Sequence, residues 1–247
     1  FFVYRHLELV GCNIAKMKRY AIGLITGALL PISAMMFIGA QNSEVGRYQV
    51  SITTDSHTIY EAIIDTKEIS DTAIIELKEE DGNFLFNMKY ATKDNFLKEK
   101  VYNCAKCLLR KKAVDALNTA GKLAKEKGYR IMFFDCYRPL YIQKKMWKIV
   151  SDPRYVANPA TGSIHNRGGA VDLTLTDMEG KPIDMGTKFD HFGKEAHHDF
   201  TELSNEVIQN RLTLKNIMIA SGFEPLNSEW WHYSLPEARK YSLGNTP

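Results

Sequence analysis

Helical spacing and short apolar runs organise the chain from about residue 107 onward. Over residues 107–127, apolar residues recur every three or four positions between Lys and Arg, which predicts an amphipathic helix that stops at Gly128. The apolar and aromatic run over residues 129–136 predicts a buried strand. A turn with Pro139 follows, so the strand is expected to end there.

The second half of the chain continues this mixture. We expect helices over residues 141–150 and 202–221, the second with Thr201 as its N-cap and Gly222 just past its end. Strands are expected over residues 170–175 and 230–235, whereas residues 45–70 show no clear element. These elements predict an α+β fold with a small antiparallel sheet flanked by helices.

The N-terminal region has the layout of an export signal. An uncharged run over residues 21–40 follows the basic residues Lys16, Lys18 and Arg19 and precedes a polar stretch. Ala40 offers a small residue for cleavage, and Pro31 would kink a spanning helix. We therefore expect residues 1–40 to be an extension with a signal peptide, and residues 41–247 to be an exported domain in the periplasm or cell envelope.

The alternative for this segment is an uncleaved anchor, because about 20 apolar residues suffice to cross a bilayer. A buried core helix fits less well, since the run has a basic flank and no polar face. Residues 1–16 precede Met17, a natural start, and Cys12 ends an accidental match to a lipoprotein cleavage box. We expect contact with a membrane only through this N-terminal segment, if it stays uncleaved.

Charge and composition narrow the classes of function. The chain has 247 residues, 45% of them hydrophobic, which is typical of a globular protein. Its net charge of +3 arises within residues 1–40, so the remaining chain is neutral overall. Nucleic acid is therefore not an expected partner, because such binding depends on clustered Lys and Arg.

The cysteine content argues against a disulfide scaffold. Cys104, Cys107 and Cys136 lie in the expected exported body, and an odd number leaves at least one free thiol in a single chain. The Cys-x-x-Cys at 104 and 107 lacks the second half of a structural zinc site. We expect these two residues to be small buried residues on one helix face.

Candidate chemistry begins in the strand over residues 170–175. Alternation places Val171, Leu173 and Leu175 on one face and Asp172 on the other. A carboxylate in so apolar a strand needs a cation, and His165 lies across a pair of glycines that lets the backbone fold back. A second imidazole, His232, occurs among aromatic residues near the C-terminus.

Two histidines and one aspartate form a three-ligand set that leaves zinc an open position for water. Glu229 would be the unligated carboxylate that moves the proton. Since residues three apart point to opposite faces of a regular strand, Glu229 is expected on a turn or bulge before His232. Arg138, which follows the buried strand and Asp135, is a candidate to face the oxyanion formed when water attacks a carbonyl.

Each of these residues also has a simpler interpretation. His165 in a glycine-rich loop is compatible with a surface position, Asp172 with a turn cap, Glu229 with a lysine ion pair and Arg138 with hydrogen bonds to loop carbonyls. The adjacent His197 and His198 are the nearest competitors for a metal.

The combination of motifs resembles the zinc D-alanyl-D-alanine dipeptidases of the vancomycin-resistance type, which share a zinc fold with the D-alanyl-D-alanine carboxypeptidases and the hedgehog signalling domain. The sequence similarity extends over residues 71–244. The motifs that carry the resemblance are Asp135-Cys136-Tyr137-Arg138-Pro139, Ser163-x-His165 with Asp172, Glu229-x-x-His232, Lys89-Tyr90-Ala91-Thr92, Cys107-Leu108-Leu109-Arg110-Lys111 and Asp184-Met185-Gly186-Thr187.

This resemblance implies one zinc ion held by His165, Asp172 and His232, with Glu229 as general base and Arg138 as transition-state stabiliser. It also implies that Ser163 and Asp190 contact a small D,D-dipeptide. Two other functions stay open: a carboxypeptidase or endopeptidase that acts on peptidoglycan stem peptides or fragments, and a non-catalytic zinc-bearing binding module.

Overall fold

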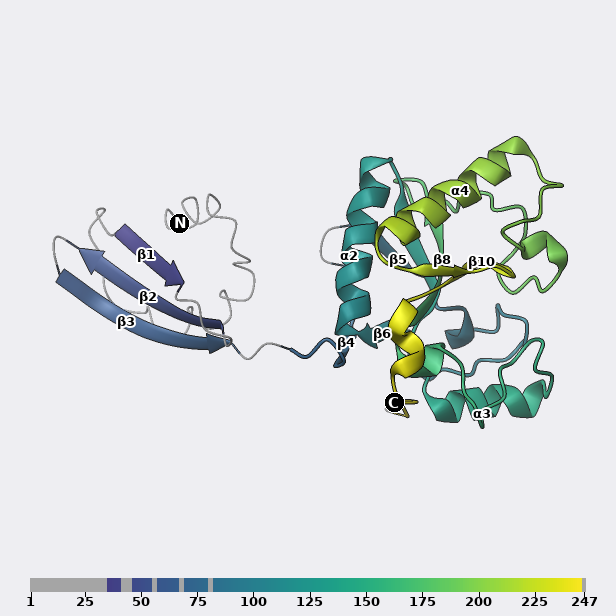
Figure 1. The fold of residues 1–247 in the computed structure, drawn as a ribbon, viewed down its shortest axis with the longest axis horizontal. Coiled ribbons are helices and arrows are strands. Elements are labelled where there is room, and N and C mark those ends of the chain that lie inside the picture. The colour runs from purple at the N-terminus through teal and green to yellow at the C-terminus, as the bar shows by residue number, and fades with distance from the viewer. Residues whose placement is uncertain (1–34, 41–45, 55–56, 67–68, 80–81, 246–247) are drawn as a thin grey trace. The chain divides into compact units, whose positions relative to one another are not determined.

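The computed structural model describes residues 35–40, 46–54, 57–66, 69–79 and 82–245. The chain separates into two compact units, Phe1–Glu68 and Ile69–Pro247. In the first unit, strands β1 (Met35–Ala40), β2 (Gly46–Thr54) and β3 (His57–Thr66) form an antiparallel sheet in that order (Figure 1).

Two expectations fall on this first unit. The expectation of no clear element over residues 45–70 is wrong, because β2 and β3 occupy most of that stretch, whose β-branched residues favour extended backbone. β1 coincides with the last residues of the expected export signal, while the rest of that signal, Met17 and Cys12 lie outside the described residues. Cleavage after Ala40 stays a prediction. Within the described chain, no helix has the length and apolar character needed to cross a membrane.

The second unit is built on a five-stranded sheet with the order β5-β7-β8-β10-β9. Its strands are β5 (Phe84–Phe86), β7 (Arg130–Asp135), β8 (Ala170–Thr176), β9 (Glu224–Leu226) and β10 (Glu229–Ser234). All neighbours are antiparallel except β5 and β7, which are parallel. The predicted α+β class is therefore confirmed, with one parallel pair at the sheet edge.

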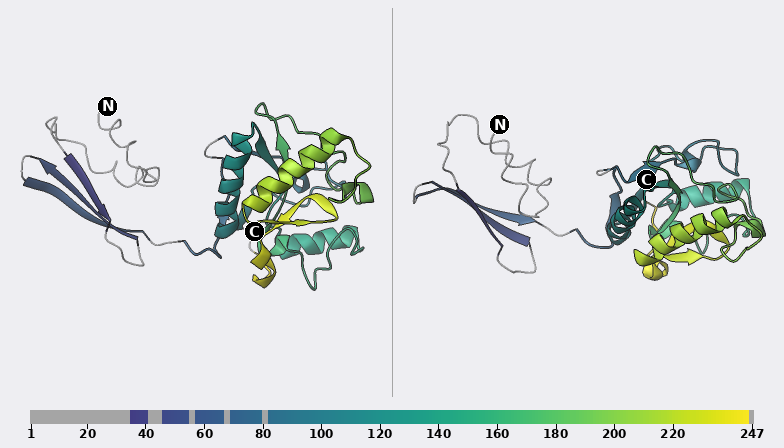
Figure 2. Two further views of the ribbon diagram at one scale, coloured as in Figure 1. Left: turned by 45° about the horizontal axis from the view of Figure 1, so that its top comes forward. Right: turned by 90° about the horizontal axis from the view of Figure 1, so that it is seen from above.

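Two long helices, α2 (Lys111–Glu126) and α4 (Asn205–Ala220), contact each other and cover one face of this sheet (Figure 2). Gly121 lies on the buried face of α2, where a Cβ would come within 2.8 Å of the Phe84 ring, so only glycine permits this close approach. The core side chains of β8 on this face are Val171, Leu173 and Leu175, as alternation predicted.

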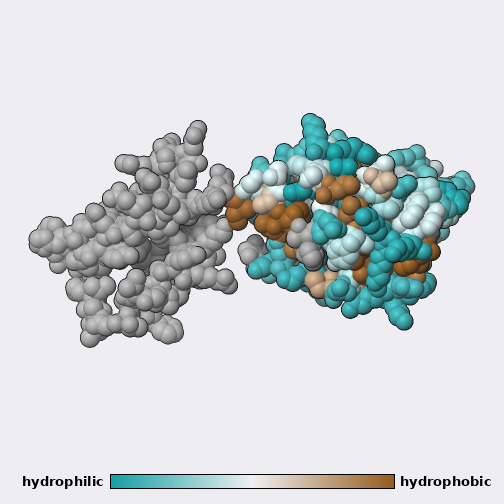
Figure 3. All heavy atoms as spheres, turned by 90° about the horizontal axis from the view of Figure 1, so that it is seen from below, coloured by the Kyte–Doolittle hydropathy of each residue, from teal (hydrophilic) through white to brown (hydrophobic). Residues whose placement is uncertain are grey.

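A second, smaller apolar cluster lies apart from this core. It includes Ile142 and Met146 of helix α3 (Leu140–Ile149), together with Leu97, Val101 and Val156. The shorter elements are the paired strands β4 (Ile74–Glu76) and β6 (Leu108–Arg110), and the 3-10 turns η2 (Lys89–Ala91), η3 (His165–Arg167), η4 (Lys194–Ala196) and η5 (Pro236–Lys240). On the face shown in Figure 3, hydrophilic residues cover most of the second unit and apolar ones form small patches.

The predicted helix over residues 107–127 begins too early. Residues Leu108–Arg110 form β6, whose backbone pairs with β4, and α2 starts only at Lys111. The backbone groups of these residues can be satisfied either by sheet pairing or by one more helical turn. Periodicity alone therefore does not distinguish a strand from a helical turn here. The N-cap of α4 is Ser204, whose hydroxyl accepts from Val207 N at 3.2 Å, rather than Thr201.

Candidate metal and catalytic site

The site is assembled on the sheet face opposite α2 and α4. Asp172 of β8 is the cross-strand partner of Asp135 in β7 and of His232 in β10. Because paired residues of adjacent strands point to the same face, three polar side chains form a row across the middle of the sheet. The register of β8 and β10 thus brings together two of the predicted ligands.

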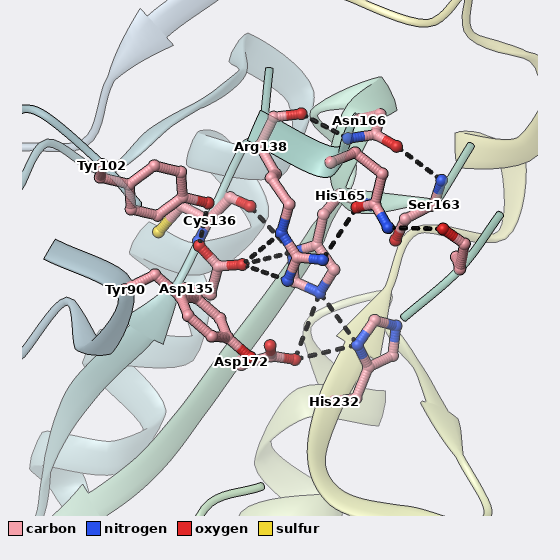
Figure 4. Close-up of polar contacts among 12 residues, drawn as sticks. Tyr90, Tyr102, Asp135, Cys136, Arg138, Ser163, His165, Asn166, Asp172 and His232 are labelled. Carbon is pink, nitrogen blue, oxygen red and sulfur yellow. Dashed lines mark hydrogen bonds and ion pairs between the residues drawn. The ribbon is translucent and has the colours of Figure 1, made fainter. Parts of the chain in front are cut away.

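His165 reaches this row from η3, where the chain turns sharply through Gly168 at a φ of 74°. Its Nε2 lies 3.1 Å from His232 Nδ1 and 3.3 Å from Asp172 Oδ1, and His232 Nδ1 lies 2.9 Å from that same oxygen. Figure 4 shows these three side chains converging on one point. In the described part of the chain, they are the one group of three His, Cys, Asp or Glu residues placed to hold a metal ion.

The donor set fits a zinc ion. In a tetrahedral site with bonds of about 2.0–2.1 Å, neighbouring ligand atoms lie about 3.3 Å apart, close to the separations among these three atoms. His165 Nδ1 lies 2.8 Å from the Cys136 carbonyl and would donate to it, which turns the lone pair of Nε2 toward His232 and Asp172. Three lone-pair atoms this close need either a hydrogen-bonding proton or a metal ion between them.

The pKa shifts of His165 and Asp172 also indicate a site that favours a cation beside a carboxylate. Burial acts to lower the pKa of His165, but the Asp172 carboxylate, its hydrogen bond and Asp135 outweigh burial and raise it. Burial acts to raise the pKa of Asp172, yet the two imidazoles lower it well below its ordinary value. The pocket therefore favours a negative carboxylate beside a cation.

Arg138 is fixed beside this row by a clamp of buried side chains. Its Nε and Nη2 donate to Asp135 Oδ2 at 3.2 and 2.6 Å, and its Nη1 donates to Gln143 Oε1 at 3.0 Å. Tyr102 donates to the other Asp135 oxygen at 2.6 Å. These contacts use three of the five N–H bonds of the guanidinium, and the described residues leave two for another acceptor. Arg138 lines the same cavity as the three candidate ligands.

Glu229 opens β10, and the strand shifts register between Glu229 and Tyr233. The expected irregularity before His232 is confirmed, and it lets both Glu229 and His232 line the cavity. Within the described chain the Glu229 carboxylate has no hydrogen-bonding partner, and burial raises its pKa, with His232 opposing that effect. A partly buried carboxylate that lacks a hydrogen-bonding partner within the described chain, beside a candidate metal site, is suited to accept a proton.

The cavity has a volume of about 640 Å³, and Asp190 and Ser163 also line it. Tyr90 donates to both Asp190 oxygens at 3.0 and 3.2 Å. Burial and then Asp172 raise the pKa of Asp190, and the hydrogen bond from Tyr90 and the charge of Arg138 oppose this shift without cancelling it. The Ser163 hydroxyl accepts the His165 backbone N–H at 3.2 Å, so Ser163 also supports the turn that carries a candidate ligand.

Several residues of the site were not predicted as functional. Tyr90, Tyr102 and Gln143 support Asp190, Asp135 and Arg138, and Asn166 donates to the Arg138 carbonyl at 2.6 Å. A tyrosine in a loop carries no periodic pattern. The one available signal was the resemblance around Lys89-Tyr90-Ala91-Thr92, which included Tyr90 without a role.

The cysteine expectation needs correction. Cys107 and Cys136 form a disulfide, and Cys107 precedes β6 rather than lying on a helix. Cys104 is free and exposed, so the predicted free thiol is present. The pairing was missed because residue 107 was assigned to a helix, which hid the approach of its backbone to the end of β7.

A cation site of two imidazoles and a carboxylate, beside an unligated, partly buried carboxylate and a clamped arginine, defines the class of metal-dependent hydrolases. Residues 76–244 match the M15 peptidase family, described as D-ala-D-ala dipeptidase. The chain belongs to this family and is a metallopeptidase.

Relatives support the same family. The chain is 38% identical over 179 residues to the D-alanyl-D-alanine dipeptidase of Escherichia coli. The aligned region covers 72% of this chain and 90% of that protein. It is 33% identical over 171 residues to the D-alanyl-D-alanine dipeptidase of Enterococcus faecium, covering 61% of this chain and 85% of that protein. The Enterococcus faecalis dipeptidase is 32% identical over the same coverage.

Proposed function

We propose that this protein is a zinc-dependent dipeptidase that hydrolyses D-alanyl-D-alanine to two D-alanines. The observation that carries the proposal is the convergence of His165, Asp172 and His232 in the cavity that Glu229, Arg138 and Asp190 also line. Membership of the D-ala-D-ala dipeptidase family supports the substrate.

His165, Asp172 and His232 would hold the zinc ion. When bound, zinc supplies a Lewis acid that acidifies water and polarises a carbonyl. The Cys136 carbonyl holds the His165 ring so that Nε2 faces the other two ligand atoms.

Glu229 acts as the general base and then as the general acid. Its carboxylate takes a proton from the attacking water and delivers it to the nitrogen of the leaving D-alanine. The raised pKa of Glu229 suits both steps, because a weakly acidic carboxyl accepts a proton more readily than an exposed one.

Arg138 stabilises the oxyanion that forms on the scissile carbonyl. Asp135 and Gln143 fix the guanidinium before substrate binds, so no reorganisation is needed in the transition state. The positive charge is buried and remains, because Asp135 and the tyrosines around it raise the pKa of Arg138 against the opposing effect of burial.

Asp190 binds the ammonium of the free dipeptide. A partly buried carboxylate whose pKa is raised gains a counter-charge when an ammonium enters, and Tyr90 holds it in place. This contact distinguishes a dipeptidase from a peptidase that trims stem peptides, whose substrates carry an amide at that position. Ser163 is the second proposed substrate contact, since it lines the cavity.

Release of D-alanine from two substrates tests the function. Purified full-length protein loaded with zinc is given the free dipeptide or an N-blocked tripeptide that ends in D-alanyl-D-alanine. We expect cleavage of the free dipeptide alone, and Asp190→Asn should raise KM for it about 10-fold or more because a charge-assisted contact is lost. Preference for the blocked peptide would establish a wall carboxypeptidase instead. Cleavage of neither would favour a zinc-bearing binding module.

We also propose that the protein works outside the cytoplasm. The apolar run over residues 21–40 after a basic flank supports export, and the Cys107–Cys136 disulfide adds support because disulfides persist in oxidising compartments. Free dipeptide from wall turnover would be its substrate there. Fractionation of cells that express the full chain tests this, and protein confined to the cytoplasm would contradict it.

A further inference from the structure

The Cys107–Cys136 disulfide lies next to the site rather than in a remote part of the core. Both cysteines are buried, and they join the residue before β6 to the residue after β7 across 29 positions of sequence. The attachment continues in the backbone, where Tyr137 N–H donates to the Leu108 carbonyl at 2.9 Å. The end of β7 is thus held to β6 by one covalent and one hydrogen bond.

The peptide groups of Cys136 contact both halves of the catalytic apparatus. Its carbonyl accepts from His165 Nδ1 at 2.8 Å, and its N–H donates to Asp135 Oδ1 at 3.0 Å. Asp135 in turn holds Arg138 (Figure 4). A displacement of Cys136 would therefore misdirect a candidate metal ligand and the arginine clamp together.

We propose that this disulfide is a positioning element of the active site, so that metal binding and catalysis depend on its oxidised state. A dithiol reductant would supply two electrons and two protons, convert Cys107 and Cys136 to thiols and itself become a disulfide. The segment from Asp135 to Arg138 would then lose its covalent link to the β6 segment and keep only noncovalent contacts. The inference about catalysis rests on the proposed function, whereas the inference about metal binding does not.

The test compares oxidised wild type, reduced wild type and the double variant Cys107→Ala/Cys136→Ala, all as full-length protein. The exposed Cys104 provides the matched control, Cys104→Ala. A phosphine reductant avoids thiol chelation of zinc; it takes oxygen from water as the disulfide gains two hydrogens, and thiol titration counts the two new thiols. Zinc affinity is measured against a chromogenic chelator, kcat and KM separately on the dipeptide, and thermal unfolding by circular dichroism.

We expect zinc affinity to fall about 10-fold or more in reduced wild type and in the double variant, as for lost outer contacts of metal ligands. We expect kcat to fall more than KM, and Cys104→Ala to match wild type. Zinc affinity and kcat are measured well below the unfolding transition. If both are unchanged and only the unfolding temperature is lower, the disulfide is a stabilising cross-link and the proposal is overturned.

The design keeps the two proposals separable. If the double variant does not fold, reduced wild type decides, because it retains both side chains; if the buried bond resists the phosphine, the folded variant decides. Oxidised wild type that binds zinc without cleaving the dipeptide would remove the proposed function, while the zinc affinities would still decide the role of the disulfide.

Discussion

Two pairs of histidines differ in how their separation along the chain relates to their arrangement in the structure. His165 and His232 are 67 positions apart, yet their ring nitrogens lie 3.1 Å from each other beside Asp172. His197 and His198 are adjacent, yet His197 is partly exposed near Asp199 at 3.9 Å while the His198 ring packs against Tyr233. Extended backbone at His197 directs neighbouring side chains to opposite sides.

The charges around the two pairs differ in the same way. Carboxylates raise the pKa of His165, whereas burial, Lys215 and Arg211 lower the pKa of His198 to about 4. A positive charge is therefore stabilised on His165 and opposed on His198. Adjacency in sequence is thus a poor guide to a metal site, and shared contact with a carboxylate is a better one.

The largest expected effect comes from removing one histidine of the convergent pair. His232→Ala should lose bound zinc together with activity, because only two of the three ligands remain. Elemental analysis of dialysed protein measures the metal, and His197→Ala is the matched control that should keep both zinc and rate. Full zinc content in His232→Ala would contradict the ligand assignment.

A smaller and more selective effect is expected at Glu229. Glu229→Gln keeps the shape of the side chain and the three ligands but cannot take a proton, so kcat should fall about 10²- to 10⁴-fold while zinc is retained. Rate assays paired with elemental analysis separate this from the His232 result. An unchanged kcat would exclude Glu229 from the mechanism.

The sequence singled out the three residues that converge in the structure, but not the residues that support them. His165, Asp172 and His232 have the residue types that zinc prefers, and alternation in β8 already separated Asp172 from the core. The roles of Gln143 and Tyr102 could not be predicted from the sequence, because their hydrogen bonds to Arg138 and Asp135 depend on how distant segments pack.

The Cys107–Cys136 pair shows why local patterns fail at element ends. Helical periodicity continued back to residue 107, whereas pairing of β6 with β4 decided the structure. The strands β2 and β3 were missed for a related reason, since weak alternation leaves strand formation to partners along the sheet.

The smallest expected effect concerns the second histidine pair and acid stability. Because folding lowers the pKa of His198 from 6.5 to about 4, the unfolded chain binds its proton first, and stability is lost as pH falls from about 6.5 toward 4. Asp199 opposes Lys215 and Arg211 only in part. His198→Gln removes this titration. Between pH 7 and pH about 4.5, the free energy of unfolding should therefore fall by about 1 kcal/mol less in the variant than in wild type, after allowance for solvent screening of a partly exposed ring. Urea unfolding at the two pH values measures the difference, with His197→Gln as the control. Equal acid losses in His198→Gln and wild type would show that the surroundings of His198 do not oppose a cation, and the contrast with His165 would fail.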